Sequence, residues 1–244
     1  LDNDLFAGTD RNYSSGVRLA WVSPGLTANK EDSRLPKWLY SLSKRAPLVR
    51  RSGFENRISF FLGQNIYTPT DLKRSDLIED DRPYAGIAYI GVGFHSRDRR
   101  VMDSLEFDLG IVGVHSFAGQ TQKILHDLFG WTYPDGWKNQ LHDELALEAG
   151  YDHKWKLLQS GSGEGFGYDL IPKLGAGLGN VYAGARIGVE VRWGWNIPDD
   201  FGTFLFQSEK EGRVVPSSRK ENPFPVRRER SGIHFYAGVE GEAV

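Results

Sequence analysis

The chain has 244 residues, no cysteine and a formal net charge of −2. The absence of cysteine excludes disulfides, and the small net charge gives no reason to expect a nucleic-acid partner. No run of about 18 apolar residues occurs, which excludes a transmembrane helix. With 29 glycines and a mean hydropathy of −0.45, the composition suits a β-barrel with a polar interior. The sequence opens without a leader peptide, and we expect any such segment to have been removed.

The first predicted strand covers residues 15–22, where Val17, Leu19 and Trp21 share one face. A segment without alternation follows at 25–55. Residues 35–45 within it have a basic amphipathic pattern. That pattern fits either a helix at a membrane surface or a helix packed on the end of a barrel.

Alternation predicts several more strands in the central part of the chain. They cover residues 57–67, 84–95, 103–114, 143–156 and 164–175. The clearest is 103–114, where Leu105, Phe107 and Leu109 face away from Glu106 and Asp108. A loop rich in turn formers and charge separates the first two at 68–83, and a glycine-serine turn at 160–163 forms a hairpin.

The longest alternating run, 181–195, places apolar residues at odd positions and arginine, glutamate and glycine at even positions. It exceeds the roughly 9–11 residues that a strand needs to cross a bilayer. Its apolar face ends in Trp193 and Trp195, and tryptophan favours membrane interfaces. Residues 232–243 alternate in the same way. A soluble β-sandwich would alternate too, so alternation alone leaves both classes open.

The polar faces of these strands favour the membrane alternative. They combine acids and arginines with glycine spacers, as expected of a barrel interior filled with ion pairs, whereas a solvent face favours lysine and threonine. The polar-face residues are Arg18, Glu106, Asp108, Glu148, Asp152, Asp169, Lys173, Arg186, Glu190, Arg192 and Glu240. We therefore predict an all-β fold, an antiparallel transmembrane β-barrel that forms one domain over residues 1–244.

Counting connections predicts which loops meet. If the strands run up and down, loops 8–14, 68–83 and 115–142 emerge at one end of the barrel. Segment 24–55 and the turns at 96–100 and 157–163 emerge at the other. A single site at the first end is therefore possible. A short helix is predicted there at 120–129 and contains His126, although a lone helical histidine is more often structural than catalytic.

Other candidate residues lie in the same group of loops. Asp4 and Asp10, with Asn3, could supply the oxygen ligands that calcium prefers. Lys73 and Arg74 could meet a phosphate, or belong to a solvated loop. The motifs G-x-S-x-G, C-x-x-C and H-E-x-x-H are absent from the sequence.

Four segments together resemble the outer-membrane lipid A 3′-O-deacylase family (LpxR). They read N-D-L-F-A-G-T-D-R-N-Y-S-S-G at 3–16, Q-N-I-Y-T-P-T-D-L-K-R at 64–74, D-D-R-P-Y-A-G at 80–86 and G-I-V-G-V-H-S-F-A-G-Q-T-Q-K-I-L-H-D-L-F-G at 110–130. Their order and spacing agree along the N-terminal two thirds of the chain, and the later strand pattern is compatible. The four motifs are specific jointly, not singly.

The resemblance implies a twelve-stranded barrel in the bacterial outer membrane, with its active site toward the outer leaflet. It also implies calcium-dependent hydrolysis of the ester that holds the 3′-acyloxyacyl chain of lipid A. About nine or ten strands can be counted here, and the sequence stops within an alternating run. Because an open edge is not tolerated in lipid, we expect C-terminal strands to be missing from this sequence.

The family's functional positions fall on residues of this chain. His126 matches the proposed base, and the asparagine–aspartate pair near the start falls on Asn3 and Asp4. The hydroxyl residue after the first tyrosine falls on Ser14. The basic pair falls on Lys73 and Arg74, with one residue fewer than the family has before it.

The resemblance leads to a hypothesis for the reaction. Neutral His126 would take a proton from water, which attacks the ester carbonyl that calcium, held partly by Asp4, polarises. Ser14 as a covalent nucleophile is a variant that lacks a sequence-adjacent base. The expected partners are lipopolysaccharide and outer-membrane lipid, with the protein as a monomer. The alternatives are an outer-membrane phospholipase, a non-catalytic pore or scaffold, and a soluble β-domain.

Overall fold

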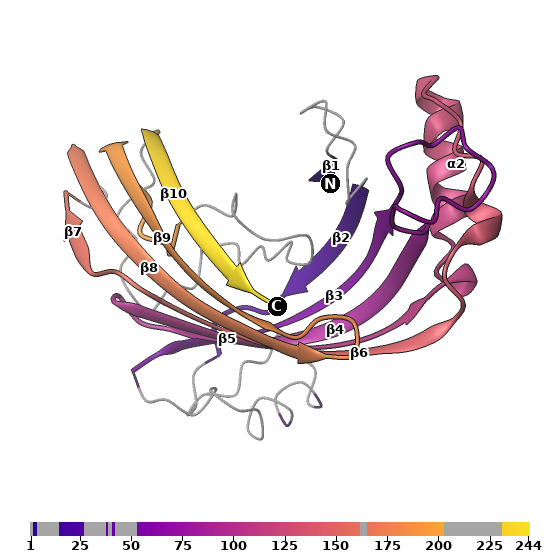
Figure 1. Cartoon of the computed structure of the whole chain (residues 1–244). Helices are drawn as coiled ribbons and strands as arrows, with labels where there is room; N and C mark the ends of the chain where they lie inside the picture. Colours follow the sequence, from indigo (N-terminus) through magenta and orange to yellow (C-terminus); the bar gives the residue numbers. More distant parts are fainter. Residues whose placement is uncertain are drawn as a thin grey trace. The chain divides into compact units, whose positions relative to one another are not determined.

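The computed structural model describes residues 2–3, 15–26, 38, 41, 53–161, 165–202 and 231–244. Within these residues the fold is a single sheet with strand order β1-β2-β3-β4-β5-β6-β8-β9-β10, and β7 pairs with β8 (Figure 1). The strands are β1 Asp2–Asn3, β2 Ser15–Val22, β3 Glu55–Tyr67, β4 Ala85–Arg97, β5 Val101–Val112, β6 Glu144–Trp155, β7 Leu158–Ser160, β8 Phe166–Gly179, β9 Gly184–Trp195 and β10 Ile233–Ala243. One α-helix, α2 (Ala118–Phe129), lies between β5 and β6, flanked by the 3-10 helices η2 (Val114–Ser116) and η3 (Trp137–Asn139).

The prediction of an all-β fold with a short helix in a long loop is confirmed. The pairs β6–β8, β8–β9 and β9–β10 are antiparallel. None of the helices within the described ranges has the length and apolar character needed to cross a membrane. The predicted helix at 35–45 falls, apart from Trp38 and Ser41, outside the described residues.

Two predicted strand ends were misplaced. The prediction ended one strand at 175 and began the next at 181, whereas β8 continues to Gly179 and β9 begins at Gly184. The reason is the register, which pairs Gly177 with Gly184, while Leu178 and Gly179 still pair with β6 and only 180–183 make the connection. Similarly, β5 ends at Val112 because Gly113 takes a φ of 103°, which starts η2.

The described chain divides into two compact units, one of Leu1–Ala20, Phe61–Gly91 and Asp108–Leu147, and one of Trp21–Phe60, Val92–Phe107 and Glu148–Val244. We call them unit 1 and unit 2 and describe each by itself.

Unit 2 contains the long strands β8, β9 and β10, which lie side by side in Figure 1. Along β9, Ile187, Trp193 and Trp195 are exposed, while Arg192 is only 1% exposed. Arg192 forms ion pairs with Asp169 and Asp200. The predicted separation into an exposed apolar face and a buried charged face is confirmed for this strand.

Further buried polar contacts fill the same unit. Glu55 accepts hydrogen bonds from Arg57 and, at 2.9 Å, from Arg97. His95 lies between two hydroxyls, at 2.9 Å from Ser59 Oγ and 3.0 Å from Ser104 Oγ. The same unit also has a small buried apolar cluster, formed by Leu26, Ile58 and Phe94.

Unit 1 also exposes apolar side chains along its strands. Leu19, Leu62, Ile90, Leu109, Leu145 and Leu147 are all exposed. A soluble sheet would bury such residues against a second layer, whereas a membrane-spanning sheet turns them toward lipid. The buried apolar residues of this unit gather instead around α2, where the candidate site lies.

Candidate active site

Helix α2 is set on the end of β4 and β5 by unusual backbone geometry. The Gly113 N–H donates to the Gly86 carbonyl at 2.9 Å, and the chain then turns through η2. Phe117, with a φ of 58°, precedes the helix, and Gly130, with a φ of 67°, ends it through a hydrogen bond to the His126 carbonyl. The helix predicted at 120–129 is thus confirmed, with its first turn two residues earlier.

The helix approaches its neighbours closely because glycines face it. A Cβ on Gly86 would lie 2.1 Å from the Ala118 Cβ and 2.5 Å from the Ser116 Oγ. A Cβ on Gly119 would lie 2.9 Å from the ring of Trp137. These two glycines therefore allow the first turn of α2 to pack directly on β4 and on η3.

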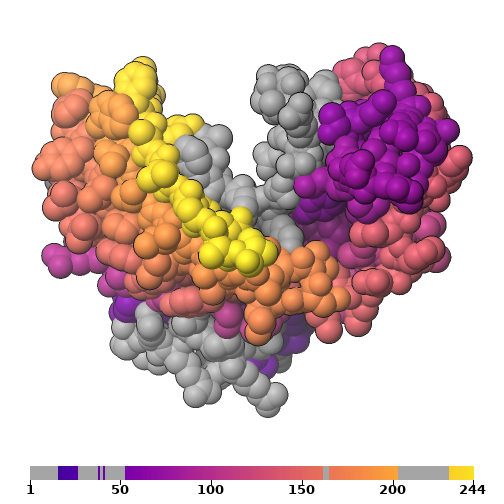
Figure 2. Space-filling view, in the orientation of Figure 1, coloured from indigo at the N-terminus to yellow at the C-terminus, as the bar shows by residue number. Residues whose placement is uncertain are grey.

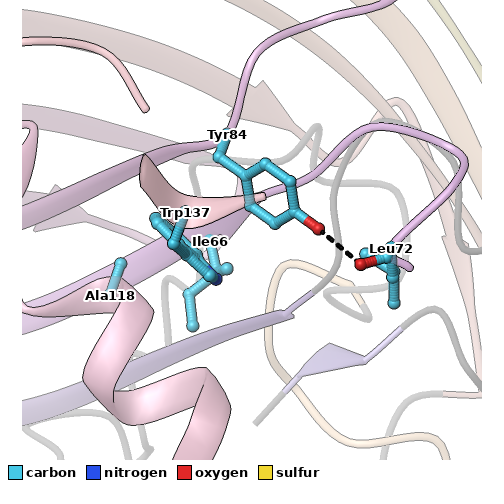
Figure 3. Packing of buried hydrophobic residues seen from close by; sticks show 5 residues of the cluster. All are labelled: Ile66, Leu72, Tyr84, Ala118 and Trp137. Atoms are coloured by element: carbon cyan, nitrogen blue, oxygen red, sulfur yellow. Dashed lines mark hydrogen bonds between the residues drawn. The ribbon is translucent and has the colours of Figure 1, made fainter. Parts of the chain in front are cut away.

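An apolar cluster joins α2 to the loop at 68–84. It consists of Ile66, Leu72, Tyr84, Ala118 and Trp137 (Figure 3). The rings of Tyr84 and Trp137 lie 4.9 Å apart, and the Tyr84 hydroxyl donates to the Leu72 carbonyl at 3.2 Å. The cluster holds strand β3, the loop and the helix as one body.

Hydrogen bonds join the same loop to the segment that follows α2. The Asp135 N–H donates to the Leu72 carbonyl at 2.9 Å, and Asn139 Nδ2 donates to the Ser75 carbonyl at 3.0 Å. In Figure 2 the violet atoms of this loop lie directly against the rose atoms of the α2 segment. The prediction that loops 68–83 and 115–142 emerge at the same end is confirmed.

His126 lies on the buried face of α2 and is 7% exposed. Its Nδ1 is hydrogen-bonded to the Thr132 carbonyl. Because a carbonyl only accepts, Nδ1 carries the proton, and Nε2 of the neutral ring is left as an acceptor. The Trp131 ring meets the imidazole edge to face at 5.5 Å. The ring is thus held in the one tautomer that can accept a proton at Nε2.

Gln122 precedes His126 by one helical turn on the same buried face and is 3% exposed. Its Oε1 accepts a hydrogen bond from Trp137 Nε1 at 2.7 Å. Trp137 therefore fixes the orientation of this amide. Both residues lie in unit 1 with His126.

A second histidine of the same loop forms a different arrangement. His115 Nδ1 lies 2.5 Å from Asp143 Oδ2, and the His115 backbone N–H donates to Asp143 Oδ1 at 2.9 Å. The backbone N–H, and then the ring, hold the pKa of Asp143 below its usual value. The His115 side chain is 69% exposed. A histidine–carboxylate pair is a known base arrangement, so His115 is the rival to His126.

The predicted basic pair lies on the exposed side of the loop at 68–84. The Lys73 side chain is exposed. The Arg74 guanidinium donates to Asp76, with Nη2 at 2.8 Å from Oδ2, and this bond raises the pKa of Arg74. Both partners are solvent-exposed, so the pair is weak and a phosphate could replace Asp76.

Asp81 closes this loop, although the sequence suggested only a charged surface. Its Oδ2 accepts the Thr70 N–H at 2.7 Å, and its Oδ1 accepts the Arg82 N–H at 2.8 Å. The hydrogen bond from the Thr70 N–H is the main cause that holds the pKa of Asp81 below its usual value.

The N-terminal candidates are described only in part. Asn3 belongs to β1, where its backbone pairs with Ser15, but its side chain is not among those described. Asp4, Asp10 and Ser14 lie outside the described residues. Within the described ranges, no three His, Asp or Glu side chains are grouped so that they could hold a metal ion. The assignment of Asp4 and Asp10 as calcium ligands stays a prediction.

Several residues of the site could not be identified from the sequence. Trp137 and Thr132 lie in a stretch without periodicity, and nothing in their spacing indicated that they contact Gln122 and His126. Tyr84 was identified only as a member of the D-D-R-P-Y-A-G motif, and its contacts were not predicted. Its proximity to glycine in D-D-R-P-Y-A-G was the one available signal of close packing.

Comparisons with known proteins agree with this architecture. A family model described as "Outer membrane protein LpxR" matches residues 1–244. Among solved structures, the chain is similar to LpxR from Salmonella typhimurium, with a TM-score of 0.67 and 17% sequence identity. The match covers 98% of this chain and 70% of that chain. At this identity the likeness shows the fold alone, and it confirms the predicted fold class. A search of curated proteins gave no match.

Proposed function

The chain belongs to the LpxR family of outer membrane proteins, and we propose that it is a hydrolase that removes the 3′-acyloxyacyl chain from lipid A. The observation that carries the proposal is the burial of His126 and the hydrogen bond that fixes its tautomer. Its buried ring donates a hydrogen bond from Nδ1 to the Thr132 carbonyl, which leaves Nε2 as an acceptor for a proton of water. Family membership supports the substrate, lipopolysaccharide, and the location in the outer membrane.

In the proposed reaction, His126 Nε2 accepts a proton while the oxygen of water bonds to the ester carbonyl carbon. The tetrahedral intermediate then collapses and breaks the bond to the 3′ oxygen of the sugar. That oxygen takes the proton back from the imidazolium. The products are a free acyloxyacyl acid and a 3′-hydroxyl on lipid A, so atoms and charge balance.

The other site residues would bind and orient the substrate. The exposed Lys73, and Arg74 once it is released from Asp76, would meet a phosphate of lipid A. The packing of Leu72 under Tyr84 keeps this basic pair near α2. Calcium, held partly by Asp4 and Asp10, would supply polarisation of the ester carbonyl and stabilise the oxyanion. Asn3 would add an amide oxygen to this calcium site, and Ser14 would be the nucleophile in the covalent variant of the reaction.

The test is an assay of the purified protein in detergent with defined lipid A, in calcium and in chelator. A parallel reaction uses phosphatidylethanolamine, and mass spectrometry identifies the products. Loss of one acyloxyacyl unit from the 3′ position, only with calcium, is the expected result. Release of fatty acid from the phospholipid instead would assign the protein as a phospholipase. No product from either lipid would favour a pore or scaffold.

A further inference from the structure

Helix α2 buries two polar side chains and exposes two large apolar ones. Its buried face carries Gln122 and His126, whereas Ile124 is 66% and Leu128 is 72% exposed. Phe117, at the start of the helix, is 59% exposed. At 100° per residue, Ile124 and Leu128 fall within one narrow stripe, opposite the buried face, and Phe117 immediately precedes the helix. We call this stripe the outer face of α2.

The backbone at Phe117 supports a contact at this face. Phe117 has a φ of 58°, a left-handed conformation that glycine or asparagine adopts with less strain. The Phe117 ring is not buried against other residues of the described protein, since its side chain is exposed. A bulky apolar residue in a strained position that is open to water indicates a contact with something apolar outside the protein.

Exposed apolar residues also occur in the elements that flank the outer face along the chain. Helix α2 is joined to β5 by η2, in which Val114 is exposed, and β5 itself exposes Leu109. On the following strand, β6, Leu145 and Leu147 are exposed too. All of these residues belong to unit 1. In an outer membrane protein, the exposed apolar surface of the strands is the surface that lipid covers.

We propose that the outer face of α2 lies against the acyl chains of the membrane and anchors the helix at the membrane boundary. The exposed polar residues Gln120 and Asp127 lie at the edge of the stripe and limit how deeply the helix can enter. The anchor turns the opposite face, which carries His126, away from bulk lipid. This inference needs the outer-membrane location but not the proposed hydrolysis.

The experiment measures how deep single positions lie in a bilayer. Because the chain has no cysteine, single cysteines can be placed by Ile124→Cys and Leu128→Cys and labelled with an environment-sensitive fluorophore. Ile90→Cys, on the exposed apolar surface of β4, is the lipid-facing control, and Glu79→Cys, in the exposed loop, is the aqueous control. The full chain is reconstituted in phosphatidylcholine–phosphatidylglycerol vesicles, and heat-modifiable migration on gels verifies folding.

Two quenchers then separate the outcomes. Probes at 124 and 128 should be quenched by lipids with a nitroxide near the headgroup, as at 90, and protected from aqueous iodide, unlike at 79. Quenching by iodide to the extent seen at 79 would overturn the proposal. Protection from both quenchers would overturn it too, because another protein surface, such as a second copy, would then cover the helix. The two positions are tested independently, so the loss of one variant leaves the test intact.

Discussion

At the scale of single residues, buried hydrogen bonds orient the polar side chains of the candidate site. Trp137 Nε1 donates a hydrogen bond to Gln122 Oε1, and His126 Nδ1 donates one to the Thr132 carbonyl. The sequence places Gln122 one helical turn before His126 once the helix is predicted, because helical spacing is a local property. It could not predict Trp137 or Thr132, because those contacts depend on how a non-periodic segment folds back.

Replacing Trp137 with phenylalanine should destabilise the protein. Phenylalanine keeps an aromatic ring of smaller volume, and the buried Gln122 Oε1 loses its donor, at a cost of about 1–3 kcal/mol. Urea unfolding in detergent, followed by intrinsic fluorescence, measures the change. The double variant Trp137→Phe/Gln122→Leu should regain most of the loss because neither polar group is then left unpaired. A double variant that is less stable than both single variants would contradict this account.

Asp81 should make the loop at 68–84 sensitive to acid. Its pKa is depressed by the N–H groups that it accepts, so its contribution is fully present above the ordinary aspartate value of about 3.9. The contribution is lost as the pH falls through the lower pKa of the folded protein. Limited proteolysis of the loop should therefore be constant from neutral pH down to that range and rise below it. In Asp81→Asn the acid-dependent rise should disappear, and a rise of unchanged size would contradict the assignment.

At the scale of elements, the strands were predictable and the placement of the helix was not. Alternation identified β9 and its faces because a strand with one lipid-facing side repeats every two residues. The ends of β8 and β9 were misplaced because register and turn position depend on pairing with the neighbour. The docking of α2 depends on Gly86 and Gly119, whose role is visible only when the facing side chains are in place.

Gly86→Ala should loosen the attachment of α2. The new Cβ would overlap the Ala118 Cβ, a backbone-proximal atom that cannot rotate away, and overpacking of this kind costs about 1–3 kcal/mol. Hydrogen exchange over 118–129 should become faster, with the strands of unit 2 unchanged. Gly241→Ala, where no atom lies within 4 Å of the added Cβ, is the matched control. Equal effects of the two substitutions would show that close packing at Gly86 is not what holds the helix.

At the scale of the whole molecule, the described residues combine buried polar contacts, exposed apolar faces and two small buried apolar clusters. In unit 2 the buried Arg192 is satisfied by Asp169 and Asp200. The sequence predicted Arg192 and Asp169 on polar strand faces from the mixture of acids and arginines, whereas Asp200 was not among the predicted residues. It could not predict the specific partners, because they depend on register and on the segment after β9.

Arg192→Met should be strongly destabilising. It leaves the Asp169 carboxylate, which is 2% exposed, without its positive partner, and breaking a buried pair in this way costs about 3–5 kcal/mol. Asp200→Asn removes the more exposed partner and should cost much less. Urea-induced unfolding of the refolded protein in vesicles compares the two variants. Similar stabilities for both would contradict the assignment of the buried pair as the stronger one.

In the proposed reaction, His126 activates water for the removal of the 3′-acyloxyacyl chain. The most direct measurement is mass spectrometry of lipid A from outer membranes that contain the wild type, His126→Ala or His115→Ala. His126→Ala should lower the amount of 3′-deacylated lipid A by about 10²–10⁴-fold. His115→Ala should leave that amount unchanged. Deacylation that survives His126→Ala and disappears with His115→Ala would contradict the account and assign the base to the His115–Asp143 pair.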